Sequence, residues 1–166
     1  MSVIAITGTG SLFGQAIIKS IKSSSYKNNT LIGMDYFNGT VGSHWVDSNF
    51  ILPDILDDNI NEDIWLENIV SIIQENKVSV LFIGVDFELP LFARYKSHIE
   101  NKTSCIVIVS DEKTIRIAND KYLTYQFLRD NNLNYPLTFL QPEVDDALDV
   151  KAIHFPMIVK PRNGYR

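Results

Sequence analysis

Short apolar runs alternate along the first part of the chain with longer stretches whose apolar residues recur at helical spacing. Residues 15–22 and 62–76 show the spacing of amphipathic helices, and a third helix is expected to end near Ile99. Apolar runs rich in β-branched residues predict buried strands at residues 3–7, 30–35, 78–83 and 104–109. Buried strands that alternate with helices predict an α/β fold, with a parallel sheet covered by helices on both faces.

The pattern changes near residues 111–120, which is the best boundary that the sequence offers. We therefore divide the chain into a first domain at residues 1–113 and a second region at residues 114–166. The second region is expected to open with helices, and Asp120 is predicted to cap one that ends near Asn132. A short helix is expected before Asp149.

Two apolar runs of the second region predict strands, at residues 137–140 and 157–159. The second run leads into Lys160 and then into a segment of Pro, Arg, Asn and Gly, which is typical of turns. A lysine that leaves a buried strand beside such a turn is well placed to meet a phosphate, because its ammonium is a compact charge on a long stem. The alternative is an ordinary strand-end lysine that reaches water.

Composition and charge exclude several classes of function. The formal net charge is −5, so there is no excess of Lys and Arg to displace counterions from nucleic acid. The single cysteine, Cys105, excludes an internal disulfide and a cysteine-based metal cluster, and it is expected to be a small buried residue. The three histidines are far apart, so no metal site is predicted. With neither a signal peptide nor a membrane-length apolar stretch in view, we expect a cytoplasmic protein that does not contact membranes.

A glycine-rich turn, Gly8-Thr9-Gly10-Ser11-Leu12-Phe13-Gly14, joins the first predicted strand to the first helix. Backbone N–H groups at such a helix N-terminus can face an anion. The pattern is G-x-G-x-x-x-G, one residue longer than the dinucleotide-binding fingerprint. Close packing of strand and helix would equally explain the glycines.

Carboxylates follow two of the predicted strands. Asp35 ends the second strand, 25 positions after Gly10 (35 − 10 = 25), and Asp86 and Glu88 follow the third. Ligands of open α/β sheets bind at the carboxyl ends of the strands, so we predict one substrate crevice lined by Gly8, Thr9, Gly10, Ser11, Leu12, Asp35, Asp86 and Glu88. For Glu88 the alternative is a favourable acidic residue in the first turn of the next helix.

Read together, these stretches resemble the ATP-grasp superfamily of carboxylate–amine ligases. The resemblance rests on the turn at residues 8–14 with Asp35, on residues 82–88, on residues 117–138, and on Phe155-Pro156-Met157-Ile158-Val159-Lys160-Pro161. Biotin carboxylase, formate-dependent phosphoribosylglycinamide formyltransferase and the carbamoyl phosphate synthetase large subunit are the most similar members. The resemblance implies a Rossmann-like pre-ATP-grasp domain followed by the start of an ATP-grasp lobe.

The resemblance also implies the site residues and the cofactor. Lys121 and Lys160 match the family's two nucleotide-binding cations, and Asp86 and Glu88 match the position where relatives hold substrate. ATP is the implied cofactor, with Mg²⁺ bound through ligands that have no counterpart in this sequence. The second lobe and the catalytic arginine also lack a counterpart, so no catalytic residue is assigned, and we expect a fragment that does not turn over ATP by itself.

Two other classes stay open. A NAD(P)-binding oxidoreductase or epimerase would explain the first turn, but no Tyr-x-x-x-Lys follows, since Gln126 and Arg129 stand four positions after Tyr122 and Tyr125. A non-catalytic small-ligand-binding module on the same fold is the other alternative. For the ligase, the expected partners are small-molecule carboxylate and amine substrates, and a homodimer is left open.

Overall fold

The computed structural model describes residues 2–164, and the chain divides into two compact units, Met1–Ser110 and Asp111–Arg166. The sequence placed this boundary between residues 113 and 114. We describe the two units separately.

The first unit alternates strands and helices as the pattern predicted. Its elements are β1 (Val3–Thr7), α1 (Leu12–Lys22), β2 (Thr30–Asp35), the 3-10 helix η1 (Gly42–Trp45), β3 (Ser48–Ile51), α2 (Glu62–Glu75), β4 (Val78–Phe82), the 3-10 helix η2 (Asp86–Glu88), α3 (Leu89–Thr103) and β5 (Ile106–Ile108). Each strand predicted for this unit is present, and β3 is an additional strand at the edge of the sheet.

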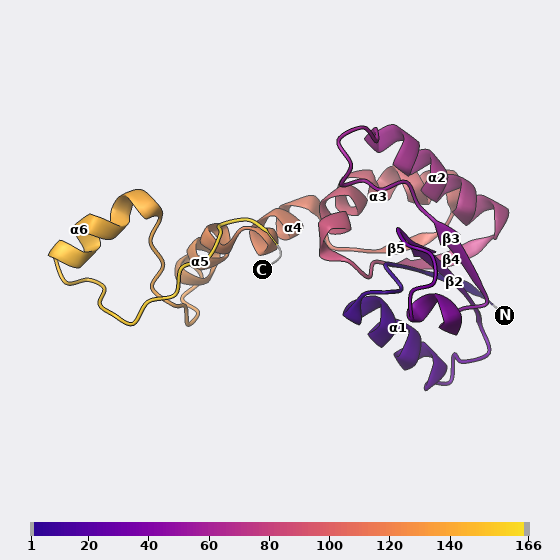
Figure 1. Ribbon diagram of the computed structural model, residues 1–166, viewed down its shortest axis with the longest axis horizontal. Helices are drawn as coiled ribbons and strands as arrows, with labels where there is room; N and C mark the ends of the chain where they lie inside the picture. Colours follow the sequence, from indigo (N-terminus) through magenta and orange to yellow (C-terminus); the bar gives the residue numbers. More distant parts are fainter. Residues whose placement is uncertain (1, 165–166) are drawn as a thin grey trace. The chain divides into compact units, whose positions relative to one another are not determined.

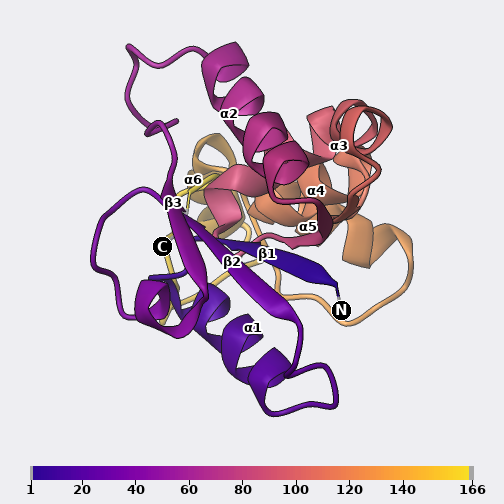
Figure 2. The ribbon, with the colours of Figure 1, turned by 90° about the vertical axis from the view of Figure 1, so that its right-hand side faces the viewer.

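The strands form one parallel sheet in the order β3-β2-β1-β4-β5. Helix α1 covers one face of the sheet, and α2 and α3 cover the other (Figures 1 and 2). The predicted fold class is therefore confirmed. Because β1 is central, its carboxyl end lies between those of β2 and β4, where the functional residues were predicted.

Side chains alternate between the two faces of β1, as the period of a strand requires. Ala5 points into the larger core under α2 and α3, where Trp65 and Phe92 are fully buried and their rings meet edge to face. Ile4 and Ile6 point the other way, into a smaller core with Ile18 of α1. Burial of these apolar side chains is the main source of the unit's stability.

Two glycines allow the backbone segments to approach closely at the start of α1. A Cβ atom on Gly14 would lie 2.2 Å from the carbonyl oxygen of Gly8, and one on Gly84 would lie 2.1 Å from that of Thr7. No side chain fits at these distances. The packing explanation for the glycine-rich turn is thus correct for Gly14.

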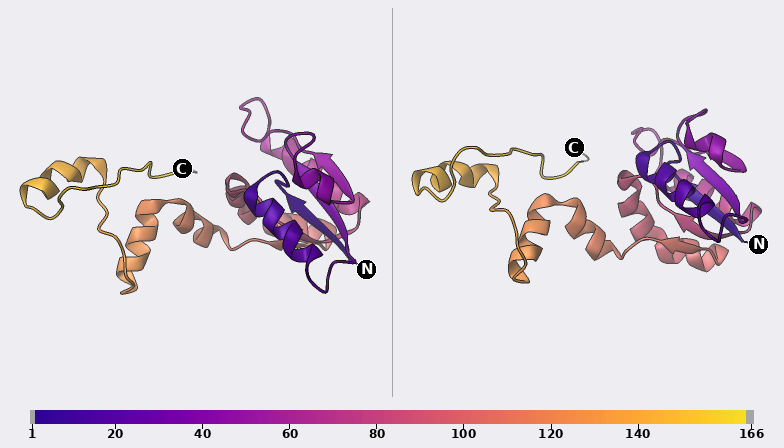
Figure 3. Two further views of the ribbon diagram at one scale, coloured as in Figure 1. Left: turned by 60° about the horizontal axis from the view of Figure 1, so that its bottom comes forward. Right: turned by 90° about the horizontal axis from the view of Figure 1, so that it is seen from below.

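The second unit contains α4 (Glu112–Asn119), α5 (Lys121–Asp130), the 3-10 helix η3 (Gln141–Glu143) and α6 (Val144–Asp149). The strands predicted at residues 137–140 and 157–159 are wrong: neither segment is a strand, and Figure 3 shows the chain after α6 as an irregular segment. Ile158 and Val159 are 84% and 94% exposed, so the second run is also not buried. A strand needs a neighbour to pair its N–H and C=O groups, and residues 111–164 contain no strand that could be that neighbour.

No helix within residues 2–164 is long and apolar enough to cross a membrane.

Candidate functional site

The turn after β1 is held in place by the side chain of Ser11. The Ser11 hydroxyl accepts a hydrogen bond of 2.9 Å from the Gly14 N–H, which caps α1, and donates one of 2.6 Å to the carbonyl oxygen of Gly84. Gly8 has φ of +54°, a left-handed conformation that glycine adopts without strain. These contacts fix the turn against the end of β4.

Asp35 supports the turn from the end of β2. One carboxylate oxygen accepts hydrogen bonds from the Thr9 hydroxyl at 2.7 Å, the Gly10 N–H at 2.7 Å and the Thr40 hydroxyl at 3.0 Å. The other accepts from the Tyr36 N–H at 2.8 Å. Asp35 is 4% exposed, so its charge is satisfied by protein donors and holds the turn in shape.

Glu88 is fully buried at the other side of β1. Its carboxylate accepts hydrogen bonds from the Thr7 hydroxyl and, at 2.6 Å, from the Tyr36 hydroxyl. Both donors are themselves anchored, because Thr7 accepts from the Gly84 N–H at 3.0 Å and Tyr36 accepts from the Trp65 indole at 3.1 Å. This network joins the ends of β1 and β4 to the loop after β2.

Burial raises the pKa of Glu88 to about 7, and the nearby charge of Asp35 adds to the effect. The hydrogen bonds from Thr7 and Tyr36 favour the carboxylate and oppose part of this rise. The pKa of Tyr36 is raised above its usual value by burial and by the charge of Glu88. Glu88 can therefore change its protonation state near neutral pH.

The structure brings several of the predicted crevice residues together. Thr9, Gly10, Asp35 and Glu88 belong to one hydrogen-bonded region at the carboxyl ends of β1, β2 and β4. Leu12 is exposed. The carboxylates of Asp35 and Glu88 both accept hydrogen bonds from protein donors. Binding of a substrate in this region stays a prediction.

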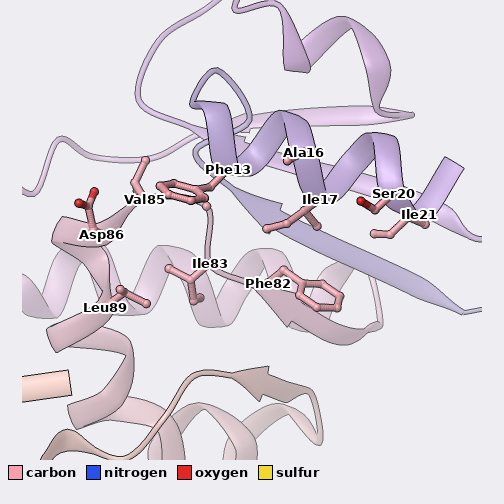
Figure 4. A pocket seen from close by; sticks show the side chains of 11 residues that line it. Phe13, Ala16, Ile17, Ser20, Ile21, Phe82, Ile83, Val85, Asp86 and Leu89 are labelled. Atoms are coloured by element: carbon pink, nitrogen blue, oxygen red, sulfur yellow. The ribbon is translucent and has the colours of Figure 1, made fainter. Parts of the chain in front are cut away.

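Asp86 is exposed and lines an apolar hollow between α1 and the end of β4 (Figure 4). The hollow has a volume of about 580 Å³. Its walls are mostly apolar side chains: Phe13, Ala16, Ile17, Ile21, Phe82, Ile83, Val85 and Leu89. The predicted substrate residue Asp86 thus lies at an apolar surface beside the turn.

Lys121 begins α5 in the second unit and contacts the segment that follows Lys160. The Lys121 N–H donates to the carbonyl oxygen of Arg162 at 3.2 Å, and its ammonium donates to the carbonyl oxygen of Gly164 at 3.2 Å. Lys160 is exposed. The two predicted nucleotide lysines therefore belong to one unit, in which the chain directly after Lys160 lies against the start of α5.

Asp120 caps α5 as predicted, and it also binds a residue that the sequence did not single out. One oxygen accepts from the N–H groups of Tyr122 and Leu123 at 2.9 and 3.0 Å, and the other accepts from Nε of Arg162 at 2.8 Å. Burial by itself would raise the pKa of Asp120, but the Leu123 N–H and the Arg162 guanidinium hold it below its usual value. Arg162 was missed because an arginine in a turn segment gives no sign of its distant partner.

The described residues offer no site for a metal ion. Within residues 2–164, no three His, Cys, Asp or Glu side chains are arranged so that they could hold one. Cys105 is buried, and burial raises the pKa of its thiol to about 11, which makes it a poor ligand and nucleophile.

Comparison with known protein families and with curated proteins gave no match to the sequence. Comparison with solved structures gave several matches to the fold. N5-carboxyaminoimidazole ribonucleotide synthetase from Thermotoga maritima matches with a TM-score of 0.66 and 17% identity, over 99% of this chain and 39% of that one. L-amino acid ligase from Bacillus licheniformis matches with a TM-score of 0.65 and 17% identity, over 99% and 38%.

The biotin carboxylase domain of the Hydrogenobacter thermophilus 2-oxoglutarate carboxylase, solved with MgADP and bicarbonate, matches with a TM-score of 0.59 and 14% identity. That match covers 92% of this chain and 33% of the other. The chain therefore shares its fold with these enzymes, which confirms the fold that the predicted resemblance implied. The chain spans roughly two fifths of their length or less.

Proposed function

We propose that this chain is the N-terminal part of an ATP-dependent carboxylate–amine ligase or a related ligase, which activates a carboxylate as an acyl phosphate. The observation that carries the proposal is the contact between Lys121 and the segment after Lys160. It places Lys121 against the backbone of Arg162 and Gly164, which closely follow Lys160 in the sequence, within a fold shared with ATP-grasp enzymes.

Lys121 and Lys160 would hold the phosphates of ATP. Two ammonium groups neutralise charge on the α- and β-phosphates, which favours transfer of the γ-phosphoryl group that ATP supplies. Lys121 now donates to the neutral carbonyl oxygen of Gly164, and a charged phosphate oxygen is a stronger acceptor. The residues present therefore fit the nucleotide.

The described residues do not fit magnesium, because residues 2–164 contain no suitable cluster of ligands. We assign no step of the reaction to a metal held by this part of the chain. In the proposed enzyme, Mg²⁺ would be bound by residues outside it.

The first unit would supply the substrate side of the active centre. The turn from Gly8 to Leu12 leads into the start of α1, where a carboxylate is favoured. The N–H groups of Gly10 and Ser11 already donate to Asp35 and to the Gly8 carbonyl oxygen, so the positive end of the helix dipole would attract the carboxylate. Asp35 and Glu88 would act from behind the turn by holding its shape, because both are buried and bonded to protein donors. Asp86, which is exposed, remains available for a direct contact with substrate.

A carbamoyl phosphate synthetase-like subtype, small carboxylate and amine substrates, a cytoplasmic location and a homodimer are further parts of this proposal. The fold and the two lysines support the general class, and the sequence resemblance supports the subtype.

The test is ATP binding by the full-length gene product and its Lys121→Ala and Lys160→Ala variants, measured by isothermal titration calorimetry. Each substitution should weaken binding by roughly 1.5–3 kcal/mol, the value of a hydrogen bond to a charged group. Lys151→Ala, an exposed lysine of the same unit, should leave binding unchanged. Unchanged affinity in both site variants would contradict the proposed nucleotide site.

A further inference from the structure

Asp120 is the only charged side chain that is buried among the described residues of the second unit, with 8% exposure. A helix cap does not require burial or a second partner. Here the carboxylate divides its two oxygens between two tasks, since one caps α5 and the other binds Arg162. The second contact joins residues 42 positions apart in the sequence.

Arg162 is held by more than this one contact. Its guanidinium lies over the ring of Tyr122, 5.5 Å from the ring centre, and its carbonyl oxygen accepts the Lys121 N–H at 3.2 Å. A planar guanidinium that bonds a carboxylate and stacks on an aromatic ring has fewer accessible conformations than a lysine at the same position. The backbone two residues after Lys160 is therefore attached to the first turn of α5.

The same contacts occupy the N–H groups at the start of α5. Those of Tyr122 and Leu123 donate to Asp120, and that of Lys121 donates to Arg162. An anion at this helix end would meet side-chain cations before free backbone donors. For an anion bound here, the positions of the Lys121 and Lys160 ammonium groups therefore matter more than the backbone N–H groups at the start of α5.

We propose that Asp120 and Arg162 are positioning residues, whose ion pair fastens the segment from Lys160 to Gly164 to the start of α5 and so sets the spacing of Lys121 and Lys160. The attachment of this segment to α5 is supported by the contacts of Asp120, Arg162 and Lys121 alone. Its consequence for ATP rests on the proposed function.

The first experiment tests the fastening without nucleotide. Asp120→Asn keeps an oxygen that caps α5, because Asn caps a helix as well as Asp does, but it removes the charge that binds Arg162. Trypsin cleavage after Arg162, followed by mass spectrometry, should accelerate by about two- to fivefold, as expected for loss of a partly exposed ion pair. Circular dichroism should show unchanged helix content.

Asp130→Asn is the matched control, because it removes an exposed pair with Arg129 of the same 2.8 Å length. It should leave cleavage after Arg162 unchanged. Equal cleavage rates in the wild-type protein and Asp120→Asn would overturn the fastening, whatever the result with ATP.

The second experiment measures ATP binding, in the presence of magnesium, by the full-length gene product. Asp120→Asn and Arg162→Gln should each weaken binding by about threefold or more. The double variant should bind no more weakly than Arg162→Gln alone, because that single change already removes both the pair and the contact with Tyr122. Faster cleavage with unchanged ATP affinity would refute the positioning role and leave the proposed function intact. If the wild-type protein binds no ATP, the proposed function and the positioning role fail together, and the cleavage result still decides the fastening.

Discussion

The Tyr36 hydroxyl donates a hydrogen bond of 2.6 Å to the buried carboxylate of Glu88, and the two residues stand 52 positions apart in the sequence. Tyr36 follows β2 and Glu88 follows β4, so the bond joins the two strands that flank β1. The Trp65 indole completes the network from α2. Polar contacts therefore hold together the edge of the sheet at which we propose that substrate binds.

Removing the Tyr36 hydroxyl should destabilise the first unit. Tyr36→Phe removes the donor to one oxygen of Glu88, whose other oxygen keeps the Thr7 hydroxyl, and leaves the Trp65 N–H without its partner. A buried polar group that loses its partner costs about 1–3 kcal/mol. Urea unfolding followed by tryptophan fluorescence would measure the change. Tyr26→Phe, at an exposed tyrosine, is the control and should stay within about 0.5 kcal/mol of the wild type.

Glu88 should make stability depend on pH. Its pKa is raised from 4.5 to about 7 in the folded protein, so between these values the folded state binds more protons than the unfolded state. Stability from this group is therefore present below pH 4.5 and is lost as the pH rises towards about 7.

Glu88→Gln should remove this slope, which is at most about 1.4 kcal/mol for each pH unit. Urea unfolding at about pH 5 and about pH 8 would measure it, with the exposed Glu67→Gln as the control. An identical pH dependence for wild type and Glu88→Gln would show that Glu88 does not titrate in this range.

The close approach at Gly14 gives a prediction about packing. Gly14→Ala places a methyl group 2.2 Å from the carbonyl oxygen of Gly8, so the start of α1 must move. We expect a loss of about 1–3 kcal/mol, as for other overpacked sites. Ser20→Ala, at an exposed position of the same helix, should not destabilise the protein, because alanine favours helices. Equal stability of the two variants in urea would contradict the close packing.

The sheet could be predicted from sequence because buried parallel strands are continuous apolar runs, and the runs at Val3–Thr7 and Thr30–Asp35 coincide with β1 and β2. The same reasoning failed at residues 157–159. An apolar run indicates that its side chains favour burial. A strand also needs a neighbouring strand for its backbone hydrogen bonds, and the local sequence does not show whether one is present.

The site could be predicted only in part. The positions of Asp35 and Glu88 at the carboxyl ends of the strands followed from the pattern. Their partners did not, since Tyr36 and Thr7 are defined by contacts across the sheet. Nor did Arg162, the partner of Asp120, because the two residues stand 42 positions apart. Spacing along the sequence shows which residues lie at the same edge of the sheet. It does not show which hydrogen-bond donors bind their carboxylates.

The first turn should not bind NAD(P). A dinucleotide needs a carboxylate after the second strand to receive the ribose hydroxyls. In this structure the corresponding residue, Asp35, is 4% exposed, and both of its oxygens accept from protein donors at 2.7 to 3.0 Å. Binding the ribose would break contacts that hold the turn, including that of Gly10.

Titration of the protein with NADH and with NADPH, followed by the fluorescence of the reduced cofactor, would test this expectation. We expect no saturable change for either cofactor. Adenosine triphosphate serves as the competitor that separates a dinucleotide site in the first unit from weak binding at Lys121 and Lys160. Micromolar affinity for NADH or NADPH that ATP does not displace would favour the oxidoreductase class over the ligase, because it would require Asp35 to exchange its protein donors for a ribose.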